Sequence, residues 1–263
     1  MEYVDVDGLR IAYRRAGSGP PLVLLHGALA DSRVWRRQVD EFSEEFTVVA
    51  WDAPGCGGSS DPPESFRLAD YADCLARCID ALGIGPAHVV GHSFGGALAL
   101  ALAGRHPGAV RSLVLVGAYA GWGGSLDADE VRARVELALR HAAAVEDEGA
   151  PPSLPGIFSD RMTPETADEL VAMMAEARPA ATRTMALGLA EADLRPVLPE
   201  IEVPALLLYG DADERAPRSV REAIDEAMPD ATLVLLPGVG HMVAEEAPDR
   251  FVDEVRRFVA TVT

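Results

Sequence analysis

Short apolar runs alternate with amphipathic stretches along most of the 263-residue chain. Apolar runs between turn residues are typical of strands buried on both faces, and amphipathic stretches are typical of helices that pack on one side. This alternation predicts strand–helix–strand units around a mostly parallel sheet. The predicted strands are residues 22–26, 47–51, 88–90, 110–116, 205–209 and 232–236, and the predicted helices are residues 35–42, 68–82, 94–105 and 248–262.

The amino-terminal segment has a different pattern. Residues 3–6 and 9–15 are joined by Asp7-Gly8, a dipeptide that favours a tight turn between two strands. We therefore predict an antiparallel hairpin at one edge of the sheet. The sheet then has about eight strands, with helices on both faces.

The region between residues 118 and 198 contains no strand-like run, while helical periodicity continues with Pro and Gly interruptions. A gap of this length between two strands needs structure of its own in a compact domain. We predict a helical cap, or lid, at residues 118–198 that covers the active site. The core is then formed by residues 1–117 and 199–263.

Composition narrows the class of protein. The formal charge of −19 would repel phosphate backbones and anionic lipid surfaces, so we expect no nucleic-acid and no membrane partner. No apolar run approaches the roughly 18–20 residues of a spanning helix, and the acidic start differs from a signal peptide, which predicts a cytoplasmic protein. The three cysteines fit neither a disulfide framework nor a tetrahedral metal site, and we expect no metal and no organic cofactor.

The strongest chemical signal is the G-x-S-x-G pattern of residues 91–95, between an apolar run and an Ala/Leu-rich helical stretch. A serine on a sharp strand-to-helix turn projects its hydroxyl above the carboxyl end of the sheet, and glycines allow the close backbone packing there. A chance match in a chain with 24 glycines is the alternative. The strand before the pattern and the helix after it favour Ser93 as a nucleophile.

A serine hydroxyl is a weak nucleophile at neutral pH and needs a base that is oriented by an acid. His241 lies in a glycine-rich loop directly after the last predicted strand and is the best placed of six histidines for the base. The loop after the preceding strand offers Asp211, Asp213 and Glu214. We predict Asp213 as the acid because it can reach across the sheet edge toward His241, whereas Asp211 is better placed to bond the amides of its own turn.

Stabilisation of an oxyanion depends mainly on the backbone here, because the chain contains no lysine and no asparagine. The amide of Phe94, directly after Ser93, is the first predicted donor. The second is the amide of Ala28, which follows His26-Gly27 at the end of another strand.

Substrate-binding candidates come mostly from the predicted cap. Met173 and Met174 suggest an adaptable apolar pocket, although methionines at helical spacing are more often plain core. Trp35 and Trp122 are predicted to line the entrance. A substrate that carries a carboxylate would require an arginine partner, for which the sequence offers several candidates that it does not rank, among them Arg134, Arg140 and Arg183.

Across essentially its whole length the chain resembles the α/β-hydrolase superfamily. The motifs that carry this resemblance stand in the family's order: His26-Gly27, residues 52–59, residues 91–96, residues 210–213 and Gly240-His241. The resemblance implies the α/β-hydrolase fold and a triad in the chain order Ser93, Asp213, His241. Residues 191–195, the Val203-Pro204 strand start and residues 237–241 are also similar to enol-lactone hydrolases and cofactor-free haloperoxidase-like esterases.

These residues together predict a serine hydrolase that cleaves a small-molecule carboxylic ester or lactone through an acyl-enzyme. One alternative is a perhydrolase, cofactor-free haloperoxidase or C–C hydrolase that uses the same triad. A second is a ligand receptor or sensor on a hydrolase scaffold. No residue pattern predicts an oligomeric state.

Overall fold

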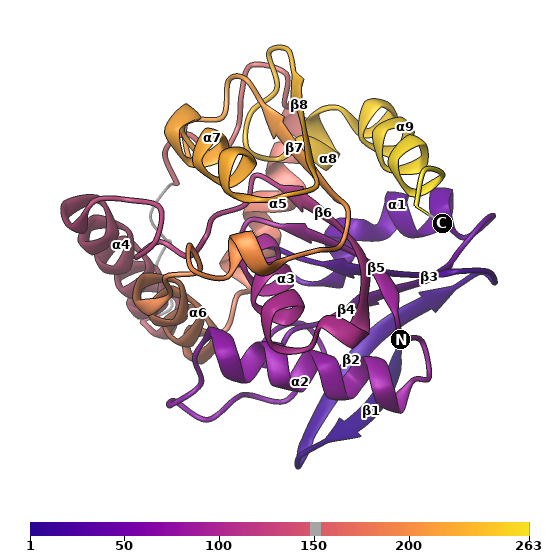
Figure 1. The fold of residues 1–263 in the computed structure, drawn as a ribbon. Helices are drawn as coiled ribbons and strands as arrows, with labels where there is room; N and C mark the ends of the chain where they lie inside the picture. Colours follow the sequence, from indigo (N-terminus) through magenta and orange to yellow (C-terminus); the bar gives the residue numbers. More distant parts are fainter. Residues whose placement is uncertain (148–153, 263) are drawn as a thin grey trace.

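The computed structural model describes residues 1–147 and 154–262 and arranges them around a central sheet (Figure 1). The sheet runs in the order β1-β2-β4-β3-β5-β6-β7-β8, and the pairs β1/β2 and β2/β4 are antiparallel while the others are parallel. The predicted mostly parallel sheet of about eight strands is confirmed. Its strands are β1 (Glu2–Val6), β2 (Leu9–Ala16), β3 (Pro21–Leu25), β4 (Thr47–Trp51), β5 (Ala87–His92), β6 (Val110–Val116), β7 (Ala205–Gly210) and β8 (Ala231–Leu236).

The amino-terminal hairpin forms the predicted antiparallel edge. Asp7 and Gly8 both adopt positive φ, at 50° and 82°, as a two-residue turn between right-twisted strands requires. Val6 pairs with Leu9 beside this turn, and Glu2 pairs with Tyr13 at the far end. β2 then pairs with β4 and joins the hairpin to the parallel part of the sheet.

Helices cover both faces of the sheet, and the strand side chains alternate between two cores. Leu22 and Leu24 of β3 belong to one core, whereas Val23 and Leu25 belong to the other. The first core includes α1 (Arg36–Phe42) and α9 (Pro248–Val259). The second includes α2 (Leu68–Ala81), α3 (Phe94–Arg105) and α7 (Arg218–Ala227).

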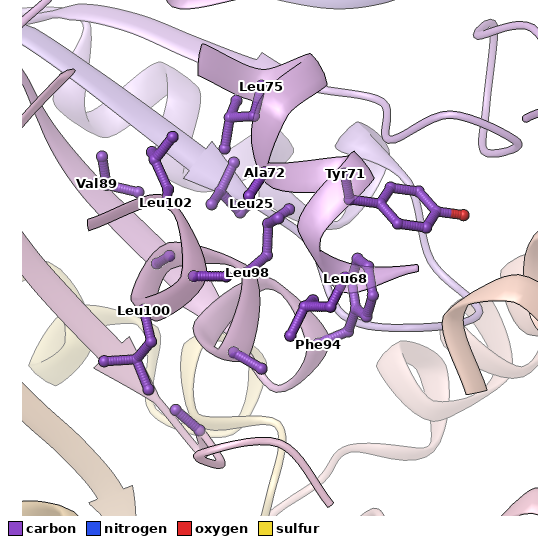
Figure 2. Close-up of a cluster of buried hydrophobic side chains, with 14 of the residues drawn as sticks. Leu25, Leu68, Tyr71, Ala72, Leu75, Val89, Phe94, Leu98, Leu100 and Leu102 are labelled. Carbon is purple, nitrogen blue, oxygen red and sulfur yellow. The ribbon is translucent and has the colours of Figure 1, made fainter. Parts of the chain in front are cut away.

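Helix α3 is the most buried helix of the second core, with buried side chains from Phe94 to Ala103. Its composition of Ala, Leu and Gly suits a helix that is enclosed nearly all round. Figure 2 shows Leu98 and Leu102 of α3 in one cluster with Leu75 of α2 and Leu25 of β3. This packing holds the amino end of α3 close to the carboxyl ends of the parallel strands.

The segment between β6 and β7, where we predicted a cap, carries helices α4 (Ala128–Glu146), α5 (Pro164–Ala175) and α6 (Pro179–Glu191), and its described residues contain no strand. Figure 1 shows α4 and α6 side by side at one side of the sheet. Ala181, Met185 and Leu189 share one face of α6 and join the core that contains α2 and α3. No helix in the described part of the chain has the length and apolar character needed to span a bilayer.

Replacement of Gly95 by Ala should lower stability, although Ala favours a helix over Gly by about 1 kcal/mol. An added Cβ at Gly95 would lie 2.3 Å from the carbonyl oxygen of Leu25, which is backbone and has little room to shift. We expect the free energy of unfolding to fall by about 1–3 kcal/mol or more in a urea titration.

Gly108→Ala is the matched control, because its added Cβ meets nothing within 4 Å. That variant should unfold at the same or a slightly higher urea concentration than the parent protein. Equal stability of the Gly95 and Gly108 variants would contradict the close approach of α3 to β3.

Candidate active site

The turn from β5 into α3 holds Ser93 in a strained conformation, with φ 52° and ψ −108°. Positive φ is uncommon for a residue with a side chain and is concentrated at functional sites. The Ser93 amide donates to the carbonyl of Val116, 2.9 Å away. An added Cβ at Gly91 would lie 2.2 Å from the carbonyl oxygen of Gly95, so the first glycine of the pattern is needed for the turn to close.

His241 and Asp213 form a buried hydrogen-bonded pair. The Nδ1–H of His241 donates to Oδ2 of Asp213 across 2.8 Å, and the two side chains are 3% and 0% exposed. Oδ1 of Asp213 accepts from the amides of Arg215 and Ala216, at 2.8 and 2.9 Å. Burial by itself would raise the pKa of Asp213, but the His241 ring and these hydrogen bonds hold that pKa below its usual value.

The other two carboxylates of the Asp213 loop are directed elsewhere. Asp211 accepts a hydrogen bond from the amide of Gly238, 2.6 Å away, and so closes the turn after β8. Glu214 is exposed. The structure therefore brings Asp213, rather than either neighbour, to His241.

Gly117, directly after β6, packs against the same pair. Its φ is +52°, and an added Cβ would lie 3.0 Å from Nδ1 of His241 and 3.4 Å from Oδ2 of Asp213. Gly117 was not among the predicted site residues, because the loop after residues 110–116 carries no carboxylate that could serve as the acid. The signal that could have found it is a glycine at the end of a central strand.

His26 and His92 hold the neighbouring loops. Nε2 of His26 accepts from the amide of Ala53 at 3.0 Å, so its Nδ1–H donates to the Gly27 carbonyl at 2.7 Å. Nε2–H of His92 donates to the carbonyl of His241, 3.0 Å away. Burial lowers the pKa of His92 to about 3, which keeps this ring neutral beside the pair.

Glu246 connects the His241 loop to the cap. Its side chain is buried and accepts from the amide of Gly240 at 2.7 Å and from the amide of Ser159 at 3.2 Å. It also accepts a short hydrogen bond from the Ser159 hydroxyl. No local pattern pairs Ser159 with Glu246, because they lie 87 positions apart.

A cavity of about 80 Å³ lies between the sheet edge and the cap, and Ser93, His241, His92 and Ala28 all line it. The hydrogen bonds of the described residues join His241 to Asp213 but not to Ser93. Phe94 follows Ser93 in the turn, and its ring packs edge-on against that of Tyr71, with 5.3 Å between the two ring centroids. Figure 2 labels both side chains. The remaining wall is mostly apolar, and its aliphatic and methionine side chains come from Leu29, Ala30, Leu137, Ala138, Leu154, Ile157, Leu170, Met173, Met174, Ala186, Leu189 and Met242.

Trp122, Met173 and Met174 line this cavity, but Trp35 does not. Trp35 is 1% exposed and stacks on Phe251, with 5.8 Å between the two ring centroids. The prediction that Trp35 lines the entrance is therefore wrong. The first position of a predicted helix is compatible with a side chain at the cavity entrance or in the core. Contact with Phe251 of α9 buries Trp35 in the core.

Arg134 is the one residue of our three named arginine candidates that lines the cavity, and Arg215 lines it as well. The Arg134 guanidinium is already bonded to Glu130, to the hydroxyl of Tyr119 and to the carbonyl of Arg215. Arg134 thus ties α4 to the Asp213 loop. Among the residues that the structure describes, no group of three or more His, Cys, Asp or Glu side chains could hold a metal ion.

The chain is similar to proteins of one known family. The model of the "Alpha/beta hydrolase family" matches residues 22–254. The chain belongs to this family. Its α/β-hydrolase fold, predicted from the order of the motifs, is thereby confirmed.

Several characterised hydrolases resemble the chain over nearly its whole length. A thermophilic esterase from Thermogutta terrifontis, solved with malate bound, superposes with a TM-score of 0.88 at 27% identity, covering 100% of this chain and 99% of the other. The enol-lactonase from Burkholderia xenovorans gives 0.85 at 26% identity, with 98% and 100% covered. The 2-(acetamidomethylene)succinate hydrolase of Mesorhizobium japonicum is 28% identical over 97% of this chain and 94% of its own length.

The buried neutral ring of His92 should make the protein less stable in mild acid. The folded-state pKa is about 3 and the unfolded-state value is near 6.5, so the stability is fully present above about pH 6.5 and is lost as pH falls toward 3. The variant His92→Gln can keep a donor for the His241 carbonyl. Between about pH 6 and pH 4 we expect its free energy of unfolding to fall less steeply than that of the wild type, with slopes that differ by up to about 1.4 kcal/mol per pH unit. Urea titrations across this range measure the two slopes. Parallel curves would contradict a buried neutral His92.

Proposed function

We propose that this protein is a serine hydrolase that cleaves a small carboxylic ester or lactone through an acyl-enzyme. The observation that carries the proposal is the buried His241–Asp213 pair, whose histidine lines the same cavity as the strained Ser93. A histidine fixed through Nδ1–H presents Nε2 as a proton acceptor. That atom is the base which a serine hydroxyl needs in order to attack a carbonyl.

The reaction proceeds in two halves. Ser93 Oγ bonds to the carbonyl carbon while Nε2 of His241 takes the hydroxyl proton, and the same proton passes to the alkoxide as the ester C–O bond breaks. Water then gives a proton to His241 and attacks the acyl-enzyme, and Ser93 leaves with that proton as the carboxylic acid is released. Asp213 stays ionised and stabilises the imidazolium that forms in each half.

The negative charge that develops on the carbonyl oxygen is held by the amides of Phe94 and Ala28. Phe94 begins α3, so its amide is one of the unpaired N–H groups at the positive end of the helix. Ala28 follows the turn fixed by His26 and lines the cavity. Leu29, the next residue, has φ 63°, a conformation that turns the chain sharply at the edge of the cavity.

The substrate class is supported by the cavity and by the relatives. The mostly apolar wall and the volume of about 80 Å³ suit a short acyl chain. Trp122, Met173 and Met174 contribute to this wall, and the two methionines can adapt their shape to different chains. The similar proteins that are named an esterase and an enol-lactonase act on bonds of this type.

Covalent labelling tests Ser93 directly. A fluorophosphonate should attach once, to the peptide that contains Ser93, because Ser93 is the only serine among the described residues that line the cavity with His241. Mass spectrometry of digested protein locates the adduct. Ser93→Ala should abolish labelling and esterase activity, while Ser219→Ala, at an exposed serine, should retain both. An adduct that persists in Ser93→Ala would refute the assignment.

The acid is tested by comparing two isosteric variants of one loop. In Asp213→Asn, the new amide donates toward Nδ1 of His241 and leaves the proton on Nε2, where it blocks the base. We expect kcat to fall by a factor on the order of 10⁴, as in serine proteases, with the fold retained in circular dichroism. Asp211→Asn can still accept from Gly238 and should keep most of its activity. Greater loss in the Asp211 variant would move the acid to that residue.

A further inference from the structure

Two polar atoms in the wall of the active-site cavity have no partner in the protein. Within residues 1–147 and 154–262, Nε1 of Trp122 and Nδ1 of His141 are buried and make no hydrogen bond. Their residues are 7% and 1% exposed, and both line the cavity that contains Ser93. A buried polar atom without a partner costs free energy, so such atoms call for an explanation.

The protonation of both groups follows from their contacts. Nε2 of His141 lies 3.0 Å from the carbonyl oxygen of Met174, which only accepts, so the ring proton is on Nε2 and Nδ1 carries a lone pair. Burial lowers the pKa of His141, which keeps that lone pair free at neutral pH. Trp122 Nε1–H only donates. Two residues that line the cavity therefore carry one unused acceptor and one unused donor.

The other polar side chains of the cap wall are already paired. Arg134 donates to Glu130, to Tyr119 and to a backbone carbonyl, and the Thr182 hydroxyl donates to the carbonyl of Arg178. Arg134, Leu137, Ala138 and His141 follow one another at helical spacing, so α4 turns a single face to the cavity. On this face, His141 is the residue with an unused hydrogen-bonding atom.

We propose that Trp122 and His141 form a subsite for a secondary amide in the acyl group of the substrate, with Trp122 donating to its C=O and His141 accepting from its N–H. This inference rests on the proposed ester hydrolysis. The N–H and C=O of a trans amide point in opposite directions, and the two partners come from different elements, the loop after β6 and helix α4. A carboxylate or ketone would leave His141 unpaired, because neither group donates a hydrogen bond.

Matched esters test this subsite. The probes are phenyl esters of N-acetylglycine, N-acetyl-β-alanine and N-acetyl-γ-aminobutyrate, which place the amide at increasing depth. Each has a ketone analogue, with CH₂ in place of N–H, and an alkane analogue that also lacks the C=O. We expect kcat/KM for the amide relative to the ketone, at the best length, to fall about tenfold in His141→Gln, the effect of one hydrogen bond to a buried group.

The variants separate recognition from folding. Gln can still donate to the Met174 carbonyl but offers no acceptor at the Nδ1 position, whereas His141→Asn restores an acceptor there and should recover part of the preference. Trp122→Phe should reduce the amide and ketone rates equally relative to the alkane. Val171→Ala, at an exposed position of α5 outside the cavity wall, should leave both ratios unchanged.

The outcomes are distinguishable from those of the proposed function. Dividing the wild-type ratio by the variant ratio cancels the intrinsic reactivity of the esters, so the subsite is measured separately from the chemistry. If the amide-to-ketone ratio is the same in the wild type and His141→Gln, or the ketone-to-alkane ratio is the same in the wild type and Trp122→Phe, at all three lengths, the subsite is refuted while ester hydrolysis stands. If the wild type hydrolyses none of the esters, the proposed function itself fails.

Discussion

The close approach of the β5–α3 turn to its neighbours is the constraint on which the site depends. Gly91 and Gly95 leave no room for a side chain, because an added Cβ would lie 2.2–2.3 Å from backbone oxygen atoms. This contact lets the chain reverse within one residue, and that residue is Ser93 at φ 52°. The burial of α3 against α2 and the sheet offsets the strain of the turn.

The carboxyl ends of the central strands meet at one edge, and the parallel topology brings distant residues together there. Ser93 follows β5, Gly117 follows β6, Asp213 follows β7 and His241 follows β8. The close pairing of Asp213 with His241 needs the small Gly117 beside it, while His92 donates to the backbone carbonyl of His241. Electrostatics and packing thus act on the same few atoms.

The cap contributes an apolar wall with a small number of polar atoms. Its helix α6 packs in the core, and Arg134 donates to a carbonyl of the Asp213 loop. Ser159 of the same segment donates to Glu246, beside the His241 loop. These contacts connect the cap to the two loops that hold the His–Asp pair. The segment between β6 and β7 is therefore part of the architecture that holds this pair.

The residue pattern alone predicts the order of the strands and helices along the chain, the sharp turn at Ser93 and the loop that carries Asp213, because alternation, glycine placement and turn chemistry are local properties. It could not place Trp35 in the core or show that Gly117 touches His241, since both depend on which elements pack together. It also could not show that the Arg134 guanidinium binds three partners, while Nδ1 of His141 on the same helix has none among the described residues. Hydrogen-bond satisfaction is decided between segments far apart in the chain, and only the tertiary structure brings those segments into contact.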